Sequence, residues 1–462
     1  MSYERLNEKV LELKDEMLDS IRESVAICSV KGEPEPDAPY GREVKQALDH
    51  ALALGEKLGF KTGNIDNRVG YVEYGEGEEM VGVLGHLDVV PLGEGWNHDP
   101  LGCEVQDGKM YGRGVQDDKG PTIGAFYALK AIKDLGLPLD RRIRVLFGFD
   151  EECGSSCVEH YIKVGGELPT IGFTPDAQFP AIFCEKGQTF WYISKKIEEA
   201  PAIKVLSIEG GVAKNVVTPK CTLVAEGDLV VEEKDYIQVE KKDGKTIVTA
   251  EGLSAHGSTP ELGKNAAVRL FDALKGNHFG GDLQKMIDFI MEKVGWETNG
   301  AALGIASEDE ETGNTTVNLG MIKYDGQELQ FTLDIRYPKN ITEETVVANV
   351  TKNIEAYGLE VENDLHSLLY VPKDSELVQK LTKVYCEETG DTDAQPIAIG
   401  GGTYARESKN SVAFGAQFPG RDYRMHGDDE FFPLSDFYDN MQIYAHAVYD
   451  LSEYLRTGKK PE

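Results

Sequence analysis

The sequence predicts an α/β catalytic domain, with a mostly parallel, mixed sheet flanked by helices, and an α+β domain inserted into it. Over residues 1–186, short apolar runs typical of buried strands alternate with helical segments, and helices and an apolar strand return after residue 377. Residues 187–376 between them are dense in charge and contain hairpin signals. We therefore expect a discontinuous catalytic domain, 1–186 and 377–462, interrupted by an inserted domain, 187–376.

The first part of the chain begins with segments that we interpret as helices over 1–28 and 39–59. Strands are predicted over 69–74 and 80–85. A helix over 120–137 has a proline in its first turn and a glycine near its end, the usual places for these residues. Two further buried strands, RRIRVLFGFDEE (141–152) and TIGFTPDAQFP (170–180), end in carboxylates.

The inserted segment has a different texture. Residues 228–250 are charged and strand-like, and 264–274 are helical in pattern. Two alternating strands around Asp325-Gly326 predict a hairpin over 315–338, because Asp-Gly is a strong turn signal. A helix opened by Thr342 follows. After about residue 377 we expect a helix, the glycine-rich AIGGGTYARE, the strand SVAFGAQFP and a last helix over 434–457.

Charge and cysteine content limit the possible partners. The chain of 462 residues carries 80 acidic against 48 basic residues, a formal net charge of −32. Such a charge argues against nucleic acid and anionic membrane surfaces as partners. The first 25 residues lack the apolar core of a signal peptide, and no run of 18 apolar residues occurs. Seven scattered cysteines suit a reducing compartment, so we expect a cytoplasmic protein.

The most informative stretch is VGVLGHLDVVP (81–91), an apolar strand that ends in His86 and is followed two residues later by Asp88. A carboxylate within reach of its second nitrogen is how a protein orients a histidine that binds a metal. Similar strand ends or loops carry the other candidate ligands: Asp117, Glu151, Glu152, Asp176 and His426. Nitrogen and oxygen donors without thiolates suit Zn²⁺, Mn²⁺ or Co²⁺.

The number of these candidates exceeds the needs of one tetrahedral ion. A pair of divalent ions sharing a bridging carboxylate fits better, with Zn²⁺ as the first choice. Each candidate also has an ordinary structural interpretation: Asp117 as a helix N-cap, Asp176 as part of a turn, and His426 as part of a surface charge cluster. All of these interpretations would have to hold together to remove the metal site.

The motifs HLDVVP, GRGVQDDKG, DEE and SAHGSTPELGKNA resemble, in this order, those of the M20 family of dinuclear metallopeptidases. The chain length, the inserted domain and GGGTYAR look most like the V-type bacterial dipeptidases, the Xaa-His dipeptidase or carnosinase-like branch. The resemblance implies a zinc-peptidase-like catalytic domain and a lid formed by the insert. It also implies a cis peptide bond between Asp117 and Asp118.

The resemblance implies a role for each candidate in the catalytic domain. One ion would be held by His86, Asp117 and Asp176, and the other by Asp117, Glu152 and His426, so that Asp117 bridges the two. Asp88 would orient His86, and Glu151 would be the general base. One departure from the family is Asp429, which stands where the family usually has an asparagine.

The lid would supply three further groups. By resemblance, His256 donates a hydrogen bond to the oxyanion, with help from Asn215, and Arg336 binds the free carboxylate of the substrate. Backbone N–H groups around Gly401 are a further candidate for anion binding, although that loop is equally well explained as a plain turn. A long lid that carries its own histidine favours a monomer that closes over a short substrate.

We therefore expect metal-dependent hydrolysis of dipeptides, with a small dipeptide as the partner molecule. The first alternative is a deacylase of the same superfamily that removes acetyl or succinyl groups from amino acids. The second is an inactive relative that only binds its ligand, for which a missing ligand or a missing Glu151 would be the sign. No such residue is missing from the sequence.

Overall fold

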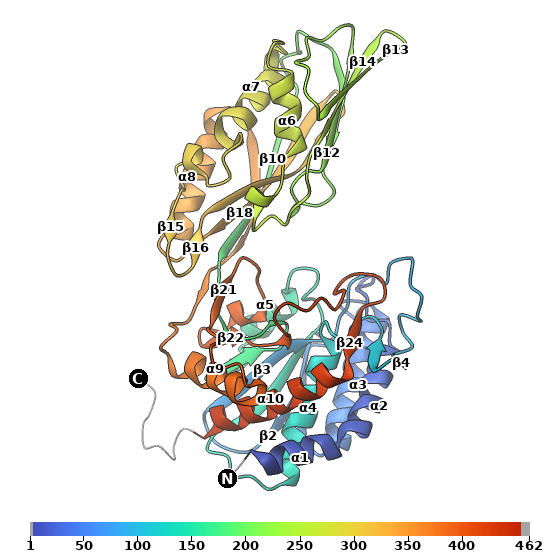
Figure 1. The fold of residues 1–462 in the computed structure, drawn as a ribbon, viewed down its shortest axis with the longest axis vertical. Coiled ribbons are helices and arrows are strands. Elements are labelled where there is room, and N and C mark those ends of the chain that lie inside the picture. Colours follow the sequence, from blue (N-terminus) through green and yellow to red (C-terminus); the bar gives the residue numbers. More distant parts are fainter. Residues whose placement is uncertain (1–2, 454–462) are drawn as a thin grey trace. The chain divides into compact units, whose positions relative to one another are not determined.

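The computed structural model describes residues 3–453, which divide into two compact units. The first unit comprises residues 3–184, 369–397 and 402–453, and the second comprises residues 185–368 and 398–401. Figure 1 labels their helices and strands, and each unit is described by itself.

The first unit is built on a nine-stranded mixed sheet, which confirms the predicted α/β class, although the parallel part is limited to four central strands and does not make up most of the sheet. The order is β1-β2-β6-β3-β7-β22-β9-β20, and β21 pairs with β9. The four neighbours β6, β3, β7 and β22 are parallel, whereas β1, β2 and β9 pair antiparallel. The strands are β1 (Lys61–Ile65), β2 (Val69–Tyr74), β3 (Met80–His86), β6 (Arg142–Gly148), β7 (Ile171–Thr174), β9 (Ile182–Glu185), β20 (Leu369–Tyr370), β21 (Ile397–Ile399) and β22 (Ser411–Ala413).

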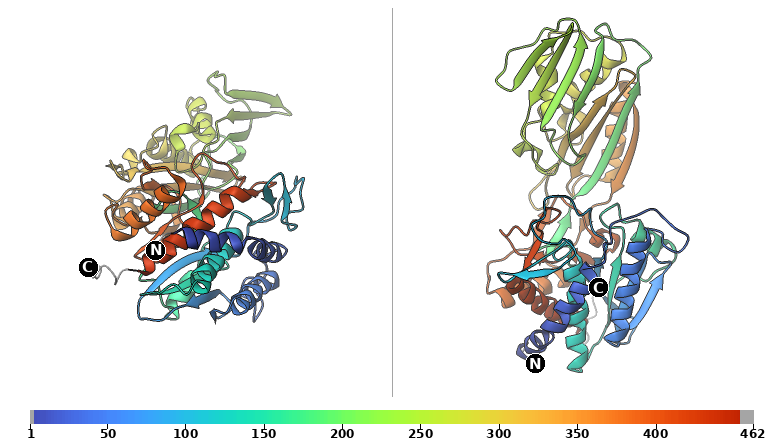
Figure 2. Two further views of the ribbon diagram at one scale, coloured as in Figure 1. Left: turned by 60° about the horizontal axis from the view of Figure 1, so that its bottom comes forward. Right: turned by 90° about the vertical axis from the view of Figure 1, so that its right-hand side faces the viewer.

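Helices α4 (Lys119–Asp134) and α10 (Leu434–Ser452) lie side by side and pack on β3 and β6 (Figures 1 and 2). They approach closely because Gly124 leaves room for Met441, with which a β-carbon at Gly124 would collide. The other helices are α1 (Glu4–Glu12), α2 (Lys14–Val25), α3 (Arg42–Lys57), α5 (Ser156–Lys163) and α9 (Glu376–Thr389).

Two small sheets lie outside the main one. In the first, β24 (Phe431–Pro433) pairs with β5 (Lys109–Tyr111), and β5 pairs with β4 (Glu104–Gln106). In the second, β8 (Ala177–Gln178) pairs with β23 (Ala416–Gln417). The first of them links the segment before Asp117 to the segment after His426, two of the candidate site residues.

The second unit is an eight-stranded antiparallel sheet in the order β13-β14-β12-β11-β17-β18-β10-β19. Its helices lie on one face, behind the strands in the right-hand view of Figure 2. The helices are α6 (Ala266–Ala273), α7 (Gly281–Phe289) and α8 (Glu343–Ala356). The strands are β10 (Gly187–Lys196), β11 (Val205–Gly210), β12 (Lys220–Glu226), β13 (Ile237–Lys242), β14 (Lys245–Glu251), β17 (Thr316–Tyr324), β18 (Glu328–Tyr337) and β19 (Glu360–His366), with a small pair β15 (Glu308–Asp309) and β16 (Gly313–Asn314).

Local signals in this unit correspond closely to the structure. The hairpin predicted over 315–338 is β17–β18 with Asp325-Gly326 in its turn. Thr342 caps α8, since its side chain accepts the N–H of Thr345. The strand-like stretch 228–250 forms the hairpin β13–β14 only from residue 237 onwards.

The division into units differs from the predicted boundaries. The first change of unit falls after Cys184 rather than after residue 186, and the second after Leu368 rather than after 376. Residues 398–401, which we expected in the catalytic domain, belong to the second unit. The reason is hydrogen bonding within that unit, because the N–H of Lys186 donates to the carbonyl of Ile399 and Arg336 donates to the carbonyl of Gly400.

Two further expectations need correction, and a third extends beyond the described residues. The single helix predicted over 1–28 is two helices that end at Val25, because Leu13 has ψ near −2° and breaks the helical geometry. The strand predicted at SVAFGAQFP is split into β22 and β23 around Gly415, whose φ of 78° does not fit a strand. The last helix ends at Ser452, and residues 454–457 of the prediction lie outside the described residues.

Within residues 3–453, no helix is long and apolar enough to cross a membrane. None of the seven cysteines, all of which lie within the described residues, forms a disulfide bond.

Candidate metal centre

The candidate centre lies in the first unit, where neighbouring strands end. His86 is the last residue of the fully buried strand β3, so it lies at the carboxyl end of that strand. Its neighbour Gly85 is small for a reason: a β-carbon there would lie 2.8 Å from Asp118 Oδ2 and would collide with Thr122. The absence of a side chain lets the loop before α4 approach β3. The other candidates follow β6 (Glu151 and Glu152) and β7 (Asp176) or lie in the loops before α4 (Asp117) and before β24 (His426).

The two carboxylate oxygens of Asp117 face two different histidines. Oδ1 lies 3.1 Å from Nε2 of His86, and Oδ2 lies 2.7 Å from Nε2 of His426. Asp176 Oδ2 is 3.6 Å from His86 Nε2, and Glu152 Oε2 is 3.3 Å from His426 Nε2. The arrangement has two halves that share Asp117, in the grouping that the resemblance implies.

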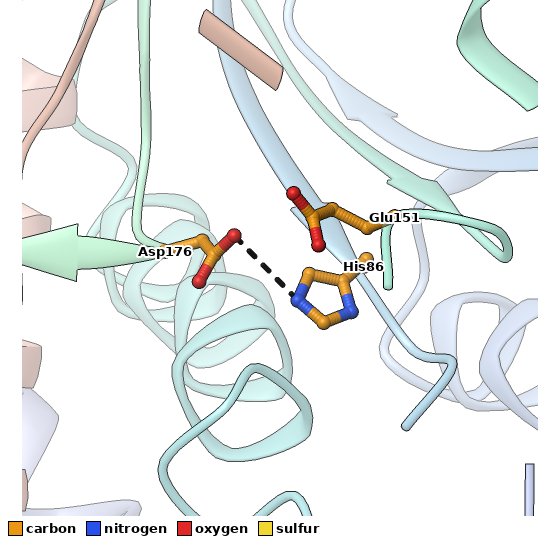
Figure 3. Close-up of side chains that lie close together, drawn as sticks. All are labelled: His86, Glu151 and Asp176. Atoms are coloured by element: carbon orange, nitrogen blue, oxygen red, sulfur yellow. Dashed lines mark ion pairs between the residues drawn. The ribbon is translucent and has the colours of Figure 1, made fainter. Parts of the chain in front are cut away.

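Glu151 joins the half that contains Asp176. Figure 3 shows the carboxylates of Glu151 and Asp176 and the imidazole of His86 turned toward one another. Ligand atoms of these three residues lie within 4.8 Å of one another, as do those of His86, Asp117 and Glu152. Either trio could hold an ion, so geometry alone allows Glu151 to act as a ligand or as a base.

The charges at this place are poorly balanced without a cation. Burial raises the pKa of Glu151 to about 8; the charge of His86 opposes that rise and the carboxylate of Glu152 adds to it. Burial and the charges of Asp117 and Glu151 hold the pKa of Asp176 well above its usual range. Glu152 Oε1 is buried and has no hydrogen-bond partner. Crowded carboxylates and an unpaired buried oxygen are what divalent cations would satisfy, so the residues fit a metal site.

The two histidines hold protons in place of such a cation. Burial lowers the pKa of His86, but hydrogen bonds to Asp117 and Asp88 outweigh it and raise that pKa well above its usual value. Hydrogen bonds to Asp117 and Glu152 raise the pKa of His426 to about 10. For Asp117 burial acts in the opposite direction, yet its bonds to both histidines hold its pKa far below the usual range. Metal ions would compete with these protons.

Asp88 and Asp118 support His86 from behind. The Nδ1 atom of His86 lies 3.1 Å from the backbone oxygen of Asp88 and 3.4 Å from its Oδ1, which leaves Nε2 to face Asp117 and Asp176. The same Asp88 carboxylate accepts the backbone N–H groups of Glu151 and Glu152. Asp118 Oδ2 accepts the N–H of His86 and the hydroxyl of Thr122, and the Asp117–Asp118 peptide bond is cis, as expected.

Two acids close to His426 in the sequence have contacts that the sequence does not reveal. Glu430 is fully buried and accepts the N–H of Asp117, and Asp429 accepts the N–H groups of Asn97 and His98. The sequence shows only a run of acids, HGDDE, which is typical of a solvated surface. Asp429 could be singled out from the sequence, because it stands where the family usually has an asparagine. Its contacts with Asn97 and His98 could not be predicted.

The three predicted lid residues, Asn215, His256 and Arg336, belong to the second unit, and so does Gly401, which we expected in the catalytic domain. Asn215 and His256 are neighbours there, since the N–H of Gly257 donates to the carbonyl of Asn215. The exposed His256 has its Nδ1 2.7 Å from Ser258 Oγ. Although part of its surface is exposed, partial desolvation and the charge of Arg336 lower the pKa of His256. Gly401, half-buried, lies in the 398–401 segment of this unit.

Arg336 is buried, with only 2% of its surface exposed, and it already has partners. Its Nε and Nη2 donate to the two oxygens of Asp334 at 3.2 and 2.9 Å, and Nη1 donates to the carbonyl of Gly400. A guanidinium carries five N–H groups, so this pairing holds the side chain in one orientation and leaves donors for a further carboxylate.

The chain is similar to known peptidases in sequence and in fold. The model of "Peptidase family M20/M25/M40" matches residues 82–450. The chain is 37% identical to "Putative dipeptidase YtjP" of Bacillus subtilis, over 96% of this chain and 99% of the relative. Among solved structures it is similar to human carnosine dipeptidase 1, with a TM-score of 0.59 and 16% identity over 98% of this chain and 100% of that one. It is also similar to aminoacylhistidine dipeptidase from Vibrio alginolyticus, with a TM-score of 0.54 and 14% identity over 93% and 96% of the two chains.

Proposed function

The chain belongs to peptidase family M20/M25/M40 and is a peptide hydrolase, and from that premise we propose that it cleaves dipeptides with two bound divalent metal ions. The observation that carries the proposal is Asp117, whose two oxygens face His86 and His426 at 3.1 and 2.7 Å. His86, Asp117 and Asp176 would hold one ion, and Asp117, Glu152 and His426 the other. All of these ligands are histidine nitrogens or carboxylate oxygens, a set that favours Zn²⁺, with Mn²⁺ or Co²⁺ as alternatives.

A pair of divalent ions supplies a water molecule of lowered pKa and a polarised substrate carbonyl. Glu151 would act as the general base and take a proton from the attacking water while the oxygen of that water bonds to the carbonyl carbon of the substrate. The same carboxyl group then gives the proton to the amine as the C–N bond breaks.

His256 has the right protonation state to stabilise the oxyanion. The N–H of Ser258 donates to its Nδ1 at 3.3 Å, so in the neutral ring the proton is on Nε2, where it can be donated. The lowered pKa favours that neutral ring at pH 7. We propose that Nε2 of His256, with Asn215, donates to the developing oxyanion.

Arg336, held in place by Asp334, would bind the free carboxylate of the substrate through its remaining N–H groups. Backbone N–H groups around Gly401 would add to that anion site. A carboxylate held near the scissile bond limits the substrate to short peptides. We further propose that the second unit acts as a lid and that the protein is a monomer. The seven cysteines of the chain form no disulfide, which supports a location in the cytoplasm. The net charge of −32 would repel nucleic acids and anionic membrane surfaces.

The test is release of free amino acids from a panel of dipeptides, with N-acetyl and N-succinyl amino acids alongside. Metal-stripped protein would be assayed before and after Zn²⁺, Mn²⁺ or Co²⁺ is added back. Metal-restored cleavage of dipeptides alone supports the proposal, and cleavage of the acylated amino acids alone would make the protein a deacylase. If none of the substrates is cleaved, the proposal is overturned, and the protein would be an inactive relative that only binds its ligand.

A variant separates the two possible roles of Glu151. Glu151→Gln should lower kcat by about 10²–10⁴, as for loss of a general base, while the protein still binds two ions. Glu159→Gln, an exposed position on α5, is the matched control and should change neither. Loss of one ion from Glu151→Gln would instead identify Glu151 as a ligand.

A further inference from the structure

A buried ion pair lies behind the candidate metal centre. Arg113 and Glu430 are exposed over only 2% and 0% of their side chains, and Nη1 of Arg113 lies 2.8 Å from Oε2 of Glu430. Neither residue is a candidate ligand. Both, however, are close in sequence to one, because Arg113 precedes Asp117 by four residues and Glu430 follows His426 by four.

The second oxygen of Glu430 organises the loop that presents Asp117. Oε1 accepts the backbone N–H groups of Gly114 and Gln116 at 3.1 Å and that of Asp117 at 3.3 Å. Three N–H groups converging on one carboxylate oxygen form a concave loop that needs an anion at its centre. Glu430 thus fixes the backbone of Asp117 from the segment that carries His426.

Arg113 extends the same network to a third segment. Its Nη2 lies 3.3 Å from the carbonyl oxygen of Leu92, and 3.5 Å from those of Pro91 and His426. The pair therefore connects the segment after β3, the loop before α4 and the loop before β24. Each of these segments carries or adjoins a residue of the candidate centre: His86, Asp117 or His426.

Stability alone does not explain this pair. A buried ion pair adds little to stability compared with apolar residues of similar size, because desolvation offsets the attraction. Here the additional hydrogen bonds go to backbone groups of the three segments that bring Asp117 and His426 together. A fixed distance between those two side chains is what a shared carboxylate between two ions requires.

We propose that Arg113 and Glu430 are positioning residues that hold Asp117 and His426 at the spacing needed to bind the second metal ion, an inference that rests on the proposed two-metal function. Partners outside the ligand set typically change metal affinity by about 10–100-fold when they are removed. The loss should fall on the ion held by Asp117, Glu152 and His426, because His426 lies on the segment that the pair connects to Asp117.

The test compares two double variants. Arg113→Met with Glu430→Gln removes the charges but keeps an oxygen to accept the backbone N–H groups. Arg144→Met with Glu73→Gln removes the charges of another buried pair, between β6 and β2, where Nη2 and Oε2 are 2.5 Å apart and 9–10% of the side chains is exposed. Mn²⁺ would be titrated into each metal-free protein, with free Mn²⁺ and the exchange-coupled signal of a bridged pair followed by electron paramagnetic resonance.

The wild type and the Arg144/Glu73 variant should bind two Mn²⁺ ions and give the coupled signal. The Arg113/Glu430 variant should bind its first ion normally and its second about 10–100-fold more weakly, with the coupled signal delayed accordingly. Should this variant not fold, Arg113→Lys, which keeps the charge but loses the fork, should weaken the second ion several-fold.

Unchanged affinity for the second ion in the Arg113/Glu430 variant, or in Arg113→Lys where that variant takes its place, would overturn the inference. An equal loss in the Arg144/Glu73 variant would do so too, since the effect would then reflect general destabilisation. A wild type that binds fewer than two ions would overturn the two-metal function itself, and this inference with it.

Discussion

Asp88 provides a sharp test of how the centre is held together. Its carboxylate is 1% exposed, accepts the N–H groups of Glu151 and Glu152 at 3.3 and 3.2 Å, and lies 3.4 Å from Nδ1 of His86. Asp88→Asn keeps one oxygen, which can accept one of the two backbone N–H groups. Its NH₂ group would face the other N–H group, which is also a donor. We predict weaker metal binding, because the variant loosens both glutamates and no longer orients His86 by charge.

The magnitude follows from these contacts. A hydrogen bond to a charged group contributes about 1.5–3 kcal/mol, and the long distances here favour the lower value for each. Loss of one bond and loss of charge from the other should cost about 2 kcal/mol of stability. Removal of such a supporting group lowers metal affinity by about 10–100-fold, equivalent to about 1.4–2.8 kcal/mol.

The assay is competition for Zn²⁺ between metal-free protein and a chelating dye, with thermal unfolding measured in parallel. Asp282→Asn is the matched control. Asp282 is a buried carboxylate of the second unit whose Oδ2 accepts two successive N–H groups, those of Glu198 and Glu199, at 2.9 and 2.8 Å, and whose Oδ1 lies 3.0 Å from Nζ of Lys285. Its substitution removes a buried charge far from the ligands in sequence and should lower stability without changing Zn²⁺ affinity. Wild-type affinity in Asp88→Asn, or an equal loss in the control, would refute the reasoning.

Three further predictions concern the lid residues and pH. His256→Ala should lower kcat by about 10²–10³ without loss of metal, and full activity would remove its role as oxyanion donor. Arg336→Lys should raise KM for dipeptides by about 10–100-fold and leave metal binding unchanged. The reason is that a lysine cannot pair with Asp334 and a substrate carboxylate at the same time. An unchanged KM would contradict the proposed role of Arg336 in binding the substrate carboxylate. Because Glu151 and His426 have pKa values raised to about 8 and 10, the folded metal-free protein retains protons that the unfolded chain has released. Its melting temperature should therefore fall, relative to that of the metal-loaded protein, as the pH rises from about 5 to 9, and a constant difference would contradict the assignment.

The sequence predicts those parts of the fold that rest on local patterns. The strand of His86 and the turn at Asp325-Gly326 appear as expected, because burial and turn preference act over a few residues. The break at Leu13 is not visible in the helical pattern, since a single residue leaves helical geometry while its side chain stays buried. The unit of Gly401 depends on hydrogen bonds from residues far away in the chain.

The candidate site divides in the same way. Side chains at strand ends were found because parallel strands deliver their ends to one sheet edge, as His86, Glu151 and Asp176 do (Figure 3). The role of Glu430 cannot be predicted from the sequence, because a buried acid and an exposed one look alike within HGDDE. Only its contacts with Arg113 and the Asp117 loop distinguish it, and these connect positions more than 300 residues apart.

The charge balance of the two units indicates where a cation is required. In the second unit the buried Asp334 is neutralised by Arg336 at 2.9 Å, so that pair is complete within the protein. In the described part of the first unit, the ion pairs of Asp117, Glu152 and Asp176 are all with histidines, which carry charge only when protonated. Folding this centre without metal therefore requires proton uptake. A divalent ion that replaces those protons stabilises the folded state by about 2.7 kcal/mol at a hundredfold excess over its dissociation constant. Metal binding and stability of the first unit should accordingly be lost together.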